Sequence, residues 1–106
     1  MKKIFAFAAI AAAAVGAHAQ DFPAGKPITI VVPFAAGGPT DRVARDLAEA
    51  LRKPLDGVSV IIDNTAGAGS TIGNAKVARA KNDGYTLLLT HVGMATTPVL
   101  YRKLPY

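Results

Sequence analysis

The sequence predicts an α/β fold in which three parallel strands alternate with helices in the order βαβαβ. Residues 28–34, 58–62 and 85–90 are rich in aliphatic and β-branched side chains, as expected for strands buried in a parallel sheet. Residues 40–53 and 70–80 carry apolar side chains at helical spacing. Short connections join these elements, so right-handed crossovers would place the helices on the faces of the sheet.

The first nineteen residues have the pattern of a secretory signal peptide. A positive end precedes an apolar run, residues 4–15, and the small-x-small motif Ala17-His18-Ala19 follows. We therefore predict cleavage between Ala19 and Gln20, and a mature periplasmic chain of residues 20–106. The apolar run is shorter than the roughly 20 residues that a membrane-spanning helix needs, so no stable membrane insertion is expected after cleavage.

The composition excludes several classes of site. The sequence has no cysteine, which rules out disulfides, thiolate metal ligands and a lipid attachment point at the cleavage site. The formal charge is +5, and loss of Lys2 and Lys3 would leave ten basic residues against seven acidic ones, or +3. The basic residues are scattered and not interleaved with aromatic ones, so no nucleic-acid partner is expected.

The first strand leads into a loop that could bind an anion. The strand reaches Pro33, residues 35–40 include Gly37-Gly38, and Thr40-Asp41 suits a helix cap. Loops at the carboxyl ends of strands commonly hold ligands, and the free N–H groups of a helix start favour carboxylate or phosphate. Paired glycines also allow a ligand to approach the main chain. The same residues are equally compatible with an ordinary βα turn.

The first helix is expected to be amphipathic and to end before Pro54. Its predicted buried face is Val43, Ala44, Leu47, Ala48 and Leu51, and its predicted solvated face is Arg42, Arg45, Asp46, Glu49 and Arg52.

The rest of the chain repeats the pattern of strand, small-residue loop and helix. The loop after residues 58–62 contains Gly67, Gly69 and Ser70, and Asn82-Asp83-Gly84 is a turn signal before the third strand. Thr90, His91 and Gly93 follow that strand and precede a short helix or turn. Because the strands would be parallel, the loops 35–40, 65–71 and 90–93 should open on the same edge of the sheet.

Other chemistries have weaker support in the sequence. The spacing Gly67, Gly69, Gly73 only approaches the dinucleotide fingerprint, so a small nucleotide- or phosphate-binding enzyme domain is an alternative. A mature chain with two serines and one histidine offers no nucleophile elbow. We expect no catalytic residue, no cofactor and no metal. His91 is compatible both with a hydrogen bond to a ligand carboxylate and with a polar strand end.

Four segments together resemble the Bug family, the periplasmic receptors of tripartite tricarboxylate transporters. They occur in the family's order and spacing along the whole mature chain. These segments are VVPFAAGGPTD with Ala44-Arg45 (residues 31–45), Asp63-Asn64 with GAG and Ile72-Gly73 (63–73), DGYTLLL (83–89) and LYRKLPY (100–106).

The resemblance implies a two-lobed periplasmic binding protein, with a type II-like fold, that closes over a small carboxylate-bearing metabolite. The receptor would deliver this metabolite to the membrane permease subunits of the transporter. Main-chain N–H groups and ordered water would hold the ligand. The residues implied to bind it are Phe34, Ala35, Ala36, Gly37, Gly38 and Thr40, with Asp41 bracing the helix start, then Gly67, Gly69 and Ser70, then Thr90, His91 and Gly93.

This sequence departs from the family pattern in three respects. Thr65-Ala66 stands where the family usually has Arg-Pro, so the second loop loses a charge, and His91 is larger than the usual residue there. Family members are also several times longer, and this sequence stops inside a motif, at Pro105-Tyr106. Residues 20–106 are therefore expected to be an incomplete first lobe that binds its ligand weakly or not at all by itself. A non-functional truncated remnant is the alternative.

Overall fold

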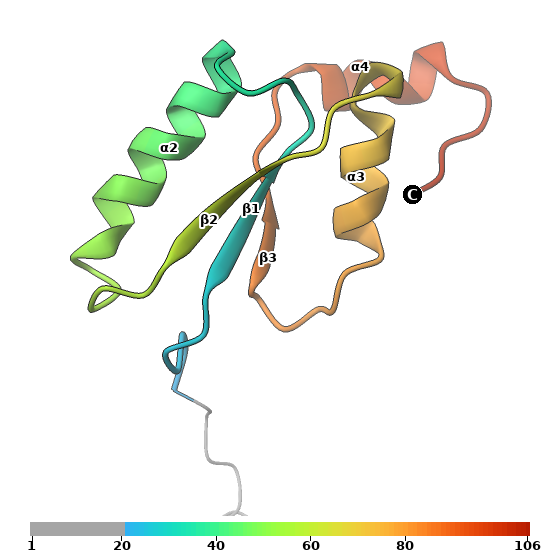
Figure 1. Ribbon diagram of the computed structural model, residues 1–106. Helices are drawn as coiled ribbons and strands as arrows, with labels where there is room; N and C mark the ends of the chain where they lie inside the picture. The colour runs from blue at the N-terminus through green and yellow to red at the C-terminus, as the bar shows by residue number, and fades with distance from the viewer. Residues whose placement is uncertain (1–20) are drawn as a thin grey trace, which may run out of the picture.

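The computed structural model describes residues 21–106, and the predicted signal peptide and cleavage site lie outside these residues. The described chain is a βαβαβ unit followed by one further helix (Figure 1). Its elements in order are strand β1 (Ile28–Val32), helix α2 (Pro39–Arg52), strand β2 (Val60–Asn64), the 3-10 turn η2 (Ala68–Ser70), helix α3 (Thr71–Ala78), strand β3 (Thr86–Leu88) and helix α4 (Gly93–Leu100). The predicted fold class and element order are confirmed.

Strand β1 lies at the centre of the sheet although it comes first in the chain. The strand order is β2-β1-β3 and both pairs are parallel, with Thr29 opposite Ile61 on one side and Thr86 on the other. Four of the five residues of β1 are buried, whereas β2 and β3 are only partly buried. The prediction of a buried second strand is wrong, because β2 has a neighbouring strand on one side only.

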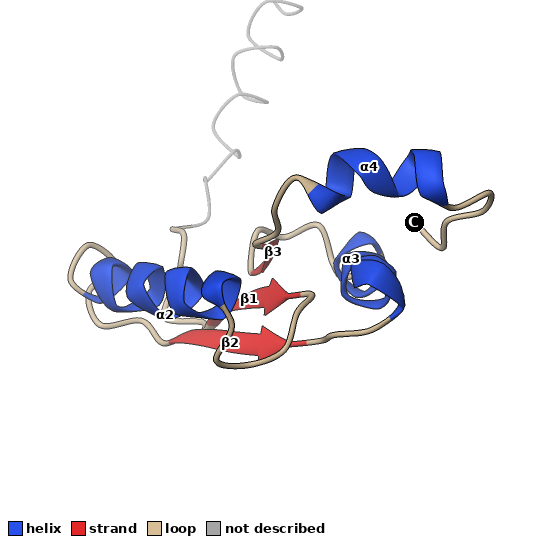
Figure 2. Ribbon diagram, turned by 90° about the horizontal axis from the view of Figure 1, so that it is seen from above, coloured by secondary structure: helices blue, strands red, loops and turns tan. Residues whose placement is uncertain are grey.

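The two crossover helices cover opposite faces of the sheet, as Figure 1 and Figure 2 show from two directions. Helix α2 contacts β1 and β2, and α3 contacts β1 and β3. The strand order requires this arrangement. The chain moves outward from β1 to β2 and then back across β1 to β3, so two right-handed crossovers place their helices on opposite faces. The described residues therefore form three layers: helix, sheet and helix.

The main apolar core lies between α2 and the sheet. Ile30, Val32 and Ala44 are at most 2% exposed. Partly buried side chains surround them: Phe34, Val60, Ile62 and Leu89. Burial of these apolar side chains supplies most of the driving force for this half of the fold.

On the opposite face, α3 approaches the sheet very closely at Gly73. A Cβ atom added there would lie 2.7 Å from the Cβ of Pro33 and 2.7 Å from the carbonyl oxygen of Thr65. Only a residue without a side chain fits between the helix and the two chain segments below it. Gly73 therefore fixes how close α3 lies to the strand ends of β1 and β2.

The boundaries of the elements differ from the predicted ones by one or two residues. The ladder between β1 and β2 continues to Asp63 and Asn64, so β2 begins and ends two residues later than predicted. Before β2, the N–H of Val58 donates to Leu55 in a turn. Asp63 and Asn64 were not predicted to belong to the strand because they are polar. Strand pairing, however, uses backbone hydrogen bonds and does not depend on the side chain.

Helix α2 begins one residue earlier than predicted, and the predicted Thr40-Asp41 cap is wrong. Gly38 is the N-cap residue, Pro39 occupies the first helical position, and no side chain caps the helix. A proline suits this position because its ring presets the helical φ angle and its missing N–H would have no partner there. Asp41 consequently lies inside the first turn, where it serves the preceding loop.

Each helix leaves one edge strand uncovered. Val43 and Leu47, predicted to be buried, are 58% and 40% exposed, because α2 lies over β1 and β2 and not over β3. On the same face of the sheet, Leu87 of β3 is 44% exposed, and on the opposite face Ile61 of β2 is 49% exposed.

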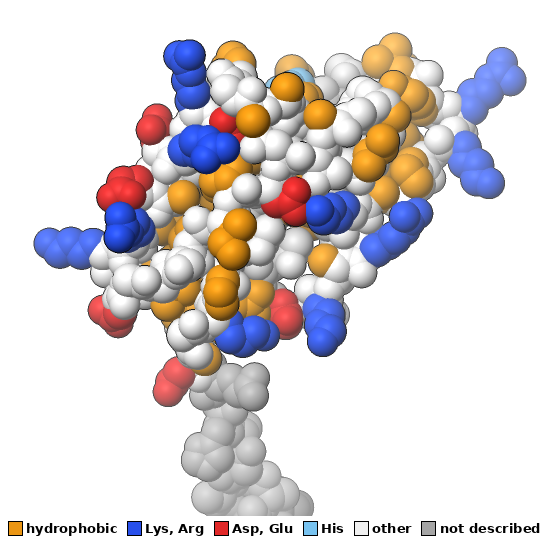
Figure 3. All heavy atoms as spheres, viewed as in Figure 1, with side chains coloured by type: hydrophobic (Ala, Val, Ile, Leu, Met, Phe, Trp, Pro, Cys, Tyr) orange, Lys and Arg blue, Asp and Glu red, His pale blue; other side chains and the backbone are white. Residues whose placement is uncertain are grey.

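Helix α4 carries further exposed apolar side chains, and Figure 3 shows hydrophobic atoms gathered over that end of the molecule. Val99 and Leu100 are 87% and 74% exposed. None of the helices within residues 21–106 is long and apolar enough to cross a membrane.

Candidate functional site

The three small-residue loops lie at one edge of the sheet, at its carboxyl end, as predicted. All three strands are parallel, so the loops that follow β1, β2 and β3 emerge side by side near the start of α2 and α3 (Figure 1). This edge contains every residue predicted to bind a ligand.

Asp41 organises the first loop. It is 2% exposed, and its Oδ2 accepts hydrogen bonds from the N–H of Gly37 at 2.7 Å and from Nε of Arg45 at 2.9 Å. The hydrogen bond from Arg45, with those from Gly37 and Asn64, lowers the pKa of Asp41 from 3.8 to about 2. A carboxylate so stabilised remains ionised and holds the loop against α2, as expected for a residue that braces the helix start.

Asn64 joins this network from the neighbouring strand. Its Nδ2 donates to Oδ1 of Asp41 at 2.9 Å and to the carbonyl oxygen of Phe34 at 3.3 Å. Nη2 of Arg45 in turn donates to Oδ1 of Asn64 at 3.4 Å. Sequence reasoning gave Asn64 no role in the site. Two signals pointed to it: its place in the Asp63-Asn64 pair of the family resemblance, and a polar amide two residues after the aliphatic run of β2.

Two of the glycine N–H groups predicted to face a ligand are already used within the loop. The N–H of Gly37 bonds Asp41, and that of Gly38 donates to the carbonyl oxygen of Ala35 at 3.4 Å. Within residues 21–106, the N–H groups of Ala35 and Ala36 donate to no protein group. Among the described residues these two N–H groups, like that of Phe34, are therefore available to a ligand, while Gly37, with φ of 82°, shapes the turn.

The second loop runs through consecutive residues with positive φ. The values are 132° at Gly67, 45° at Ala68, 60° at Gly69 and 78° at Ser70. Ala68 and Ser70 are strained there, because a Cβ atom clashes with the backbone in left-handed conformations. Such strain persists only where surrounding contacts impose it, and it is common at binding sites.

Contacts on both sides hold the second loop in this conformation. The hydroxyl of Thr71 donates to the carbonyl oxygen of Ala68 at 2.9 Å, and the N–H of Ser70 donates to Gly67 at 3.0 Å. Tyr101, which follows α4, covers Gly69 so closely that an added Cβ would lie 2.5 Å from its hydroxyl oxygen. Glycine suits this position because of its positive φ, and a larger residue would also displace the Tyr101 hydroxyl.

The side chain of Ser70 points into the protein. Ser70 is 4% exposed, and its hydroxyl accepts a hydrogen bond from Nδ2 of Asn74 at 3.4 Å. The same amide nitrogen lies 3.2 Å from the hydroxyl of Tyr106, and Oδ1 of Asn74 has no partner within the described chain. The C-terminal segment thus supports the second loop from behind, and a direct contact from Ser70 to a ligand stays a prediction.

A lysine reaches the second loop from α3. Nζ of Lys76 pairs with Asp63 and lies 3.3 Å from the hydroxyl of Thr65. The hydrogen bond from Lys76, with one from Thr65, lowers the pKa of Asp63. Lys76 therefore brings a positive charge to the position where Thr65-Ala66 had been expected to leave the loop without one.

The third loop contacts the first through an aromatic pair. The ring of His91 stacks on Phe34, with centroids 4.3 Å apart and planes at 13°. Nδ1 of His91 accepts a hydrogen bond from the N–H of Gly93 at 3.0 Å. The hydroxyl of Thr90 is buried and has no partner among the described residues.

A hollow of about 220 Å³ lies between the start of α2 and the end of β3. It is lined by Pro39, Thr40, Val43, Leu89, Thr90 and His91. Three predicted site residues, one from α2 and two from the third loop, therefore share one hollow. Gly67, Gly69, Ser70 and Gly93 do not line it, and neither do the first-loop residues from Phe34 to Gly38.

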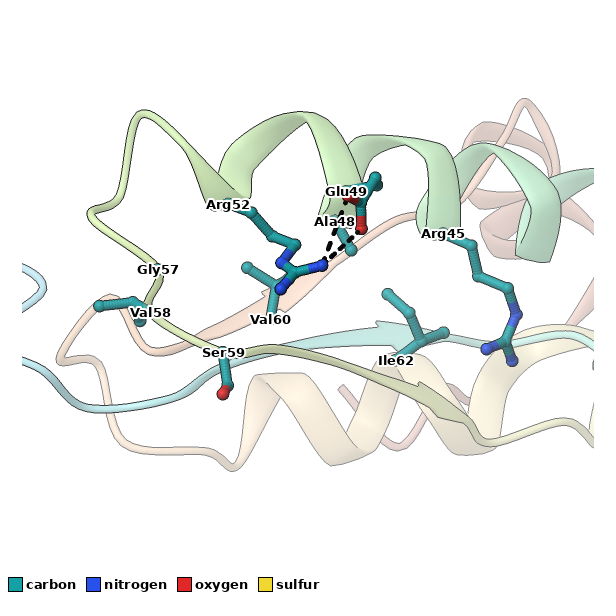
Figure 4. Close-up of a pocket in the computed structure, with 9 residues that line it drawn as sticks. All are labelled: Arg45, Ala48, Glu49, Arg52, Gly57, Val58, Ser59, Val60 and Ile62. Carbon is teal, nitrogen blue, oxygen red and sulfur yellow. Dashed lines mark hydrogen bonds and ion pairs between the residues drawn. The ribbon is translucent and has the colours of Figure 1, made fainter.

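A second hollow, of about 430 Å³, lies along the open edge of β2 and outside the predicted site (Figure 4). In this view Arg52 points toward Glu49, and Nη1 of Arg52 lies 3.3 Å from the carboxylate. Val60 and Ile62 of β2 are among the residues that line this hollow. Charged side chains beside an edge strand hinder pairing with other chains, so we assign this hollow to edge protection.

Comparison with known proteins adds independent evidence. Residues 43–106 match the sequence model of the family described as "Tripartite tricarboxylate transporter family receptor". A UPF0065 protein from the TAR-I ttuE-ttuC' intergenic region of Agrobacterium vitis is 51% identical over 90 residues, which are 85% of this chain and 26% of that protein. The chain thus spans about a quarter of the length of this relative.

Solved structures agree with the sequence matches. The periplasmic binding protein BugD superposes with a TM-score of 0.72 and 56% identity, over 76% of this chain and 27% of that one. MatC from Rhodopseudomonas palustris, solved with bound malate, superposes with a TM-score of 0.73 and 44% identity, over 80% of this chain and 29% of that one.

Proposed function

The chain belongs to the tripartite tricarboxylate transporter receptor family, and we propose that it captures a small carboxylate-bearing metabolite at the carboxyl edge of its sheet. The family is one of receptors and not of enzymes, and its structural relatives are periplasmic binding proteins. The malate bound to MatC indicates the class of ligand to test. The described residues would form part of the first lobe of such a receptor.

The observation that carries this proposal is the network around Asp41. It uses a buried, ionised carboxylate to hold the first loop in place, while the N–H groups of Ala35 and Ala36 donate to no protein group within residues 21–106. Donors fixed before the ligand arrives need not be ordered on binding, which favours affinity. The ligand would sit against this loop, the second loop at Gly67, Gly69 and Ser70, and the third at Thr90, His91 and Gly93.

Export, a receiving partner and lobe closure are part of the same proposed function. The signal peptide, residues 1–19, would direct export to the periplasm and be removed before Gln20. The permease subunits of a tripartite tricarboxylate transporter would be the receiving partner. Closure of a second lobe over the ligand would complete the site.

Calorimetric titration of the whole native protein with malate and other small dicarboxylates tests the proposal. We expect micromolar affinity, and a loss of about tenfold or more for Asp41→Asn, because the loop would lose the charge that holds it. Asp46→Asn, an exposed position on the same helix, is the matched control and should bind as the wild type does. A protein that binds nucleotides instead, or binds neither, would contradict the proposal.

A further inference from the structure

His91 is held in one orientation by two contacts from different parts of the chain. Its ring lies against Phe34 of the first loop at 4.3 Å between centroids, nearly parallel. Its Nδ1 accepts a hydrogen bond from the N–H of Gly93, two residues later in the chain. An added Cβ at Gly93 would lie 3.0 Å from Cε1 of the ring, so the main chain also packs against the imidazole. A side chain restrained on two sides loses little further freedom when it binds something.

The hydrogen bond from Gly93 assigns the proton of the neutral ring. Because Nδ1 acts as an acceptor, the proton lies on Nε2, and Nε2–H is a donor. Within the part of the chain that the structure describes, Nε2 has no hydrogen-bond partner. His91 therefore presents a single directed donor whose position is set by its contacts with Phe34 and Gly93.

The hollow that His91 lines suits an anionic group. Its other polar side chains are Thr40 and Thr90, and its apolar ones include Val43 and Leu89. None of the described residues that line it is acidic, and the nearby carboxylate of Asp41 is engaged by Arg45 and Gly37. The buried hydroxyl of Thr90, without a partner, adds a second potential donor. Closure of a second lobe, as proposed above, would exclude water from this hollow and strengthen hydrogen bonds formed there.

We infer that His91 determines specificity, by donating a hydrogen bond from Nε2 to a carboxylate oxygen of the ligand. This inference rests on the proposed function and adds to it a side-chain donor, beyond the main-chain donors of the first loop. The ligand must then offer an acceptor at the His91 end of the hollow. A metabolite with an apolar end there would leave the donor unpaired in the closed site, which costs binding free energy.

Three variants separate the donor from the other roles of the ring. His91→Phe keeps a flat ring against Phe34 but removes both nitrogens. His91→Asn keeps an oxygen that can accept from Gly93, but its shorter amide places no donor at the position of Nε2. His91→Gln keeps an N–H donor of similar reach and lacks the ring. If the donor matters, the Phe and Asn variants should each bind malate at least tenfold more weakly than wild type, and the Gln variant should lie within about threefold.

The measurement is calorimetric titration of the whole native protein with malate, with a thermal melt of each variant to confirm folding. Equal malate affinity of wild type and all variants would overturn the inference and leave the proposed function standing. An equal loss in all three variants would also overturn it, since the ring contact would then be responsible. A wild type that fails to bind any carboxylate would overturn both proposals. Long-range ¹H–¹⁵N spectra provide a second readout, since malate should shift Nε2 of His91 more than Nδ1.

Discussion

At the scale of single residues, the first loop depends on one carboxylate that receives hydrogen bonds from three sides. Asp41 accepts from Gly37, Arg45 and Asn64, and it lies within the first turn of α2. The positive end of the helix further favours the ionised form. The loop is therefore held by an interaction that protonation would weaken.

The pH dependence of stability should reveal this interaction. The pKa of Asp41 is lowered from 3.8 to about 2 in the folded state, so its contribution to the free energy of unfolding is present above pH 3.8. It is lost as the pH falls from there toward 2, because the unfolded state takes up the proton first. Urea unfolding of wild type and Asp41→Asn between pH 2 and 7 measures the difference, which should shrink across this window. Parallel curves would contradict the assignment, and Asp46→Asn serves as control.

The ion pair between Lys76 and Asp63 should contribute much less to stability. The two side chains are 49% and 30% exposed, and exposed pairs are screened by water and salt. Lys76→Ala should therefore lower the free energy of unfolding by less than about 1 kcal/mol. Lys81→Ala, at an exposed position outside the helix, controls for loss of a positive charge. A cost of several kcal/mol for Lys76→Ala, measured by urea unfolding, would show that the pair holds α3 in place.

At the scale of elements, the contact between α3 and the strand ends depends on Gly73. The two atoms that block a side chain there belong to Pro33 and to the backbone of Thr65. Neither can rotate away as the end of a flexible side chain could. The angle and distance of α3, and with them the position of the second loop, therefore follow from one small residue.

Gly73→Ala should destabilise the protein although alanine is the better helix former. Overpacking against fixed atoms costs up to about 3 kcal/mol, whereas alanine gains about 1 kcal/mol in helix propensity, so we expect a net loss of about 2 kcal/mol. Ala78→Gly, an exposed position in the same helix, reports the propensity effect alone. Thermal and urea unfolding give both values. A stabilised Gly73→Ala variant would disprove the close approach.

Much of this arrangement could be predicted from the sequence, and the failures have a common cause. Aliphatic runs and helical spacing gave the element order, and parallel strands then required the loops to meet at one edge. Contacts between distant segments could not be predicted, because local pattern carries no information on them. Asn64 reaching Asp41 and Tyr106 reaching Asn74 are of this kind. The left-handed conformations of Ala68 and Ser70 were missed because neither residue is a glycine.

At the scale of the whole molecule, the described residues expose apolar side chains on the sheet and on α4 that a sheet covered on both faces would bury. Leu87 and Ile61 lie on uncovered parts of the sheet, and Val99 and Leu100 project from α4. Exposed apolar patches mark surfaces that other chain or other molecules cover. Residues 21–106 in isolation should therefore tend to associate with themselves.

This tendency can be tested on α4. The double variant Val99→Ser with Leu100→Ser removes two side chains that are 87% and 74% exposed. It should weaken self-association of residues 21–106 by roughly thirtyfold or more in dissociation constant, since each of the two apolar side chains contributes about 1 kcal/mol or more when buried. Sedimentation equilibrium measures the constant, and Thr96→Ser on the same helix is the control. If association is unchanged, α4 does not mediate it, and the uncovered parts of the sheet are the surface to test next.

The central position of β1 also has a consequence for the order of folding. β1 is synthesised first, yet Thr29 finds its partners only at Ile61 and Thr86. The three-stranded sheet cannot be completed until β3 has been synthesised. Pairing strands that lie far apart in the chain also costs loop entropy before the hydrogen bonds between them form. A slow-folding chain stays extended for longer after synthesis. For a protein proposed to be exported, the central position of the first strand should therefore slow folding in the interval between synthesis and export.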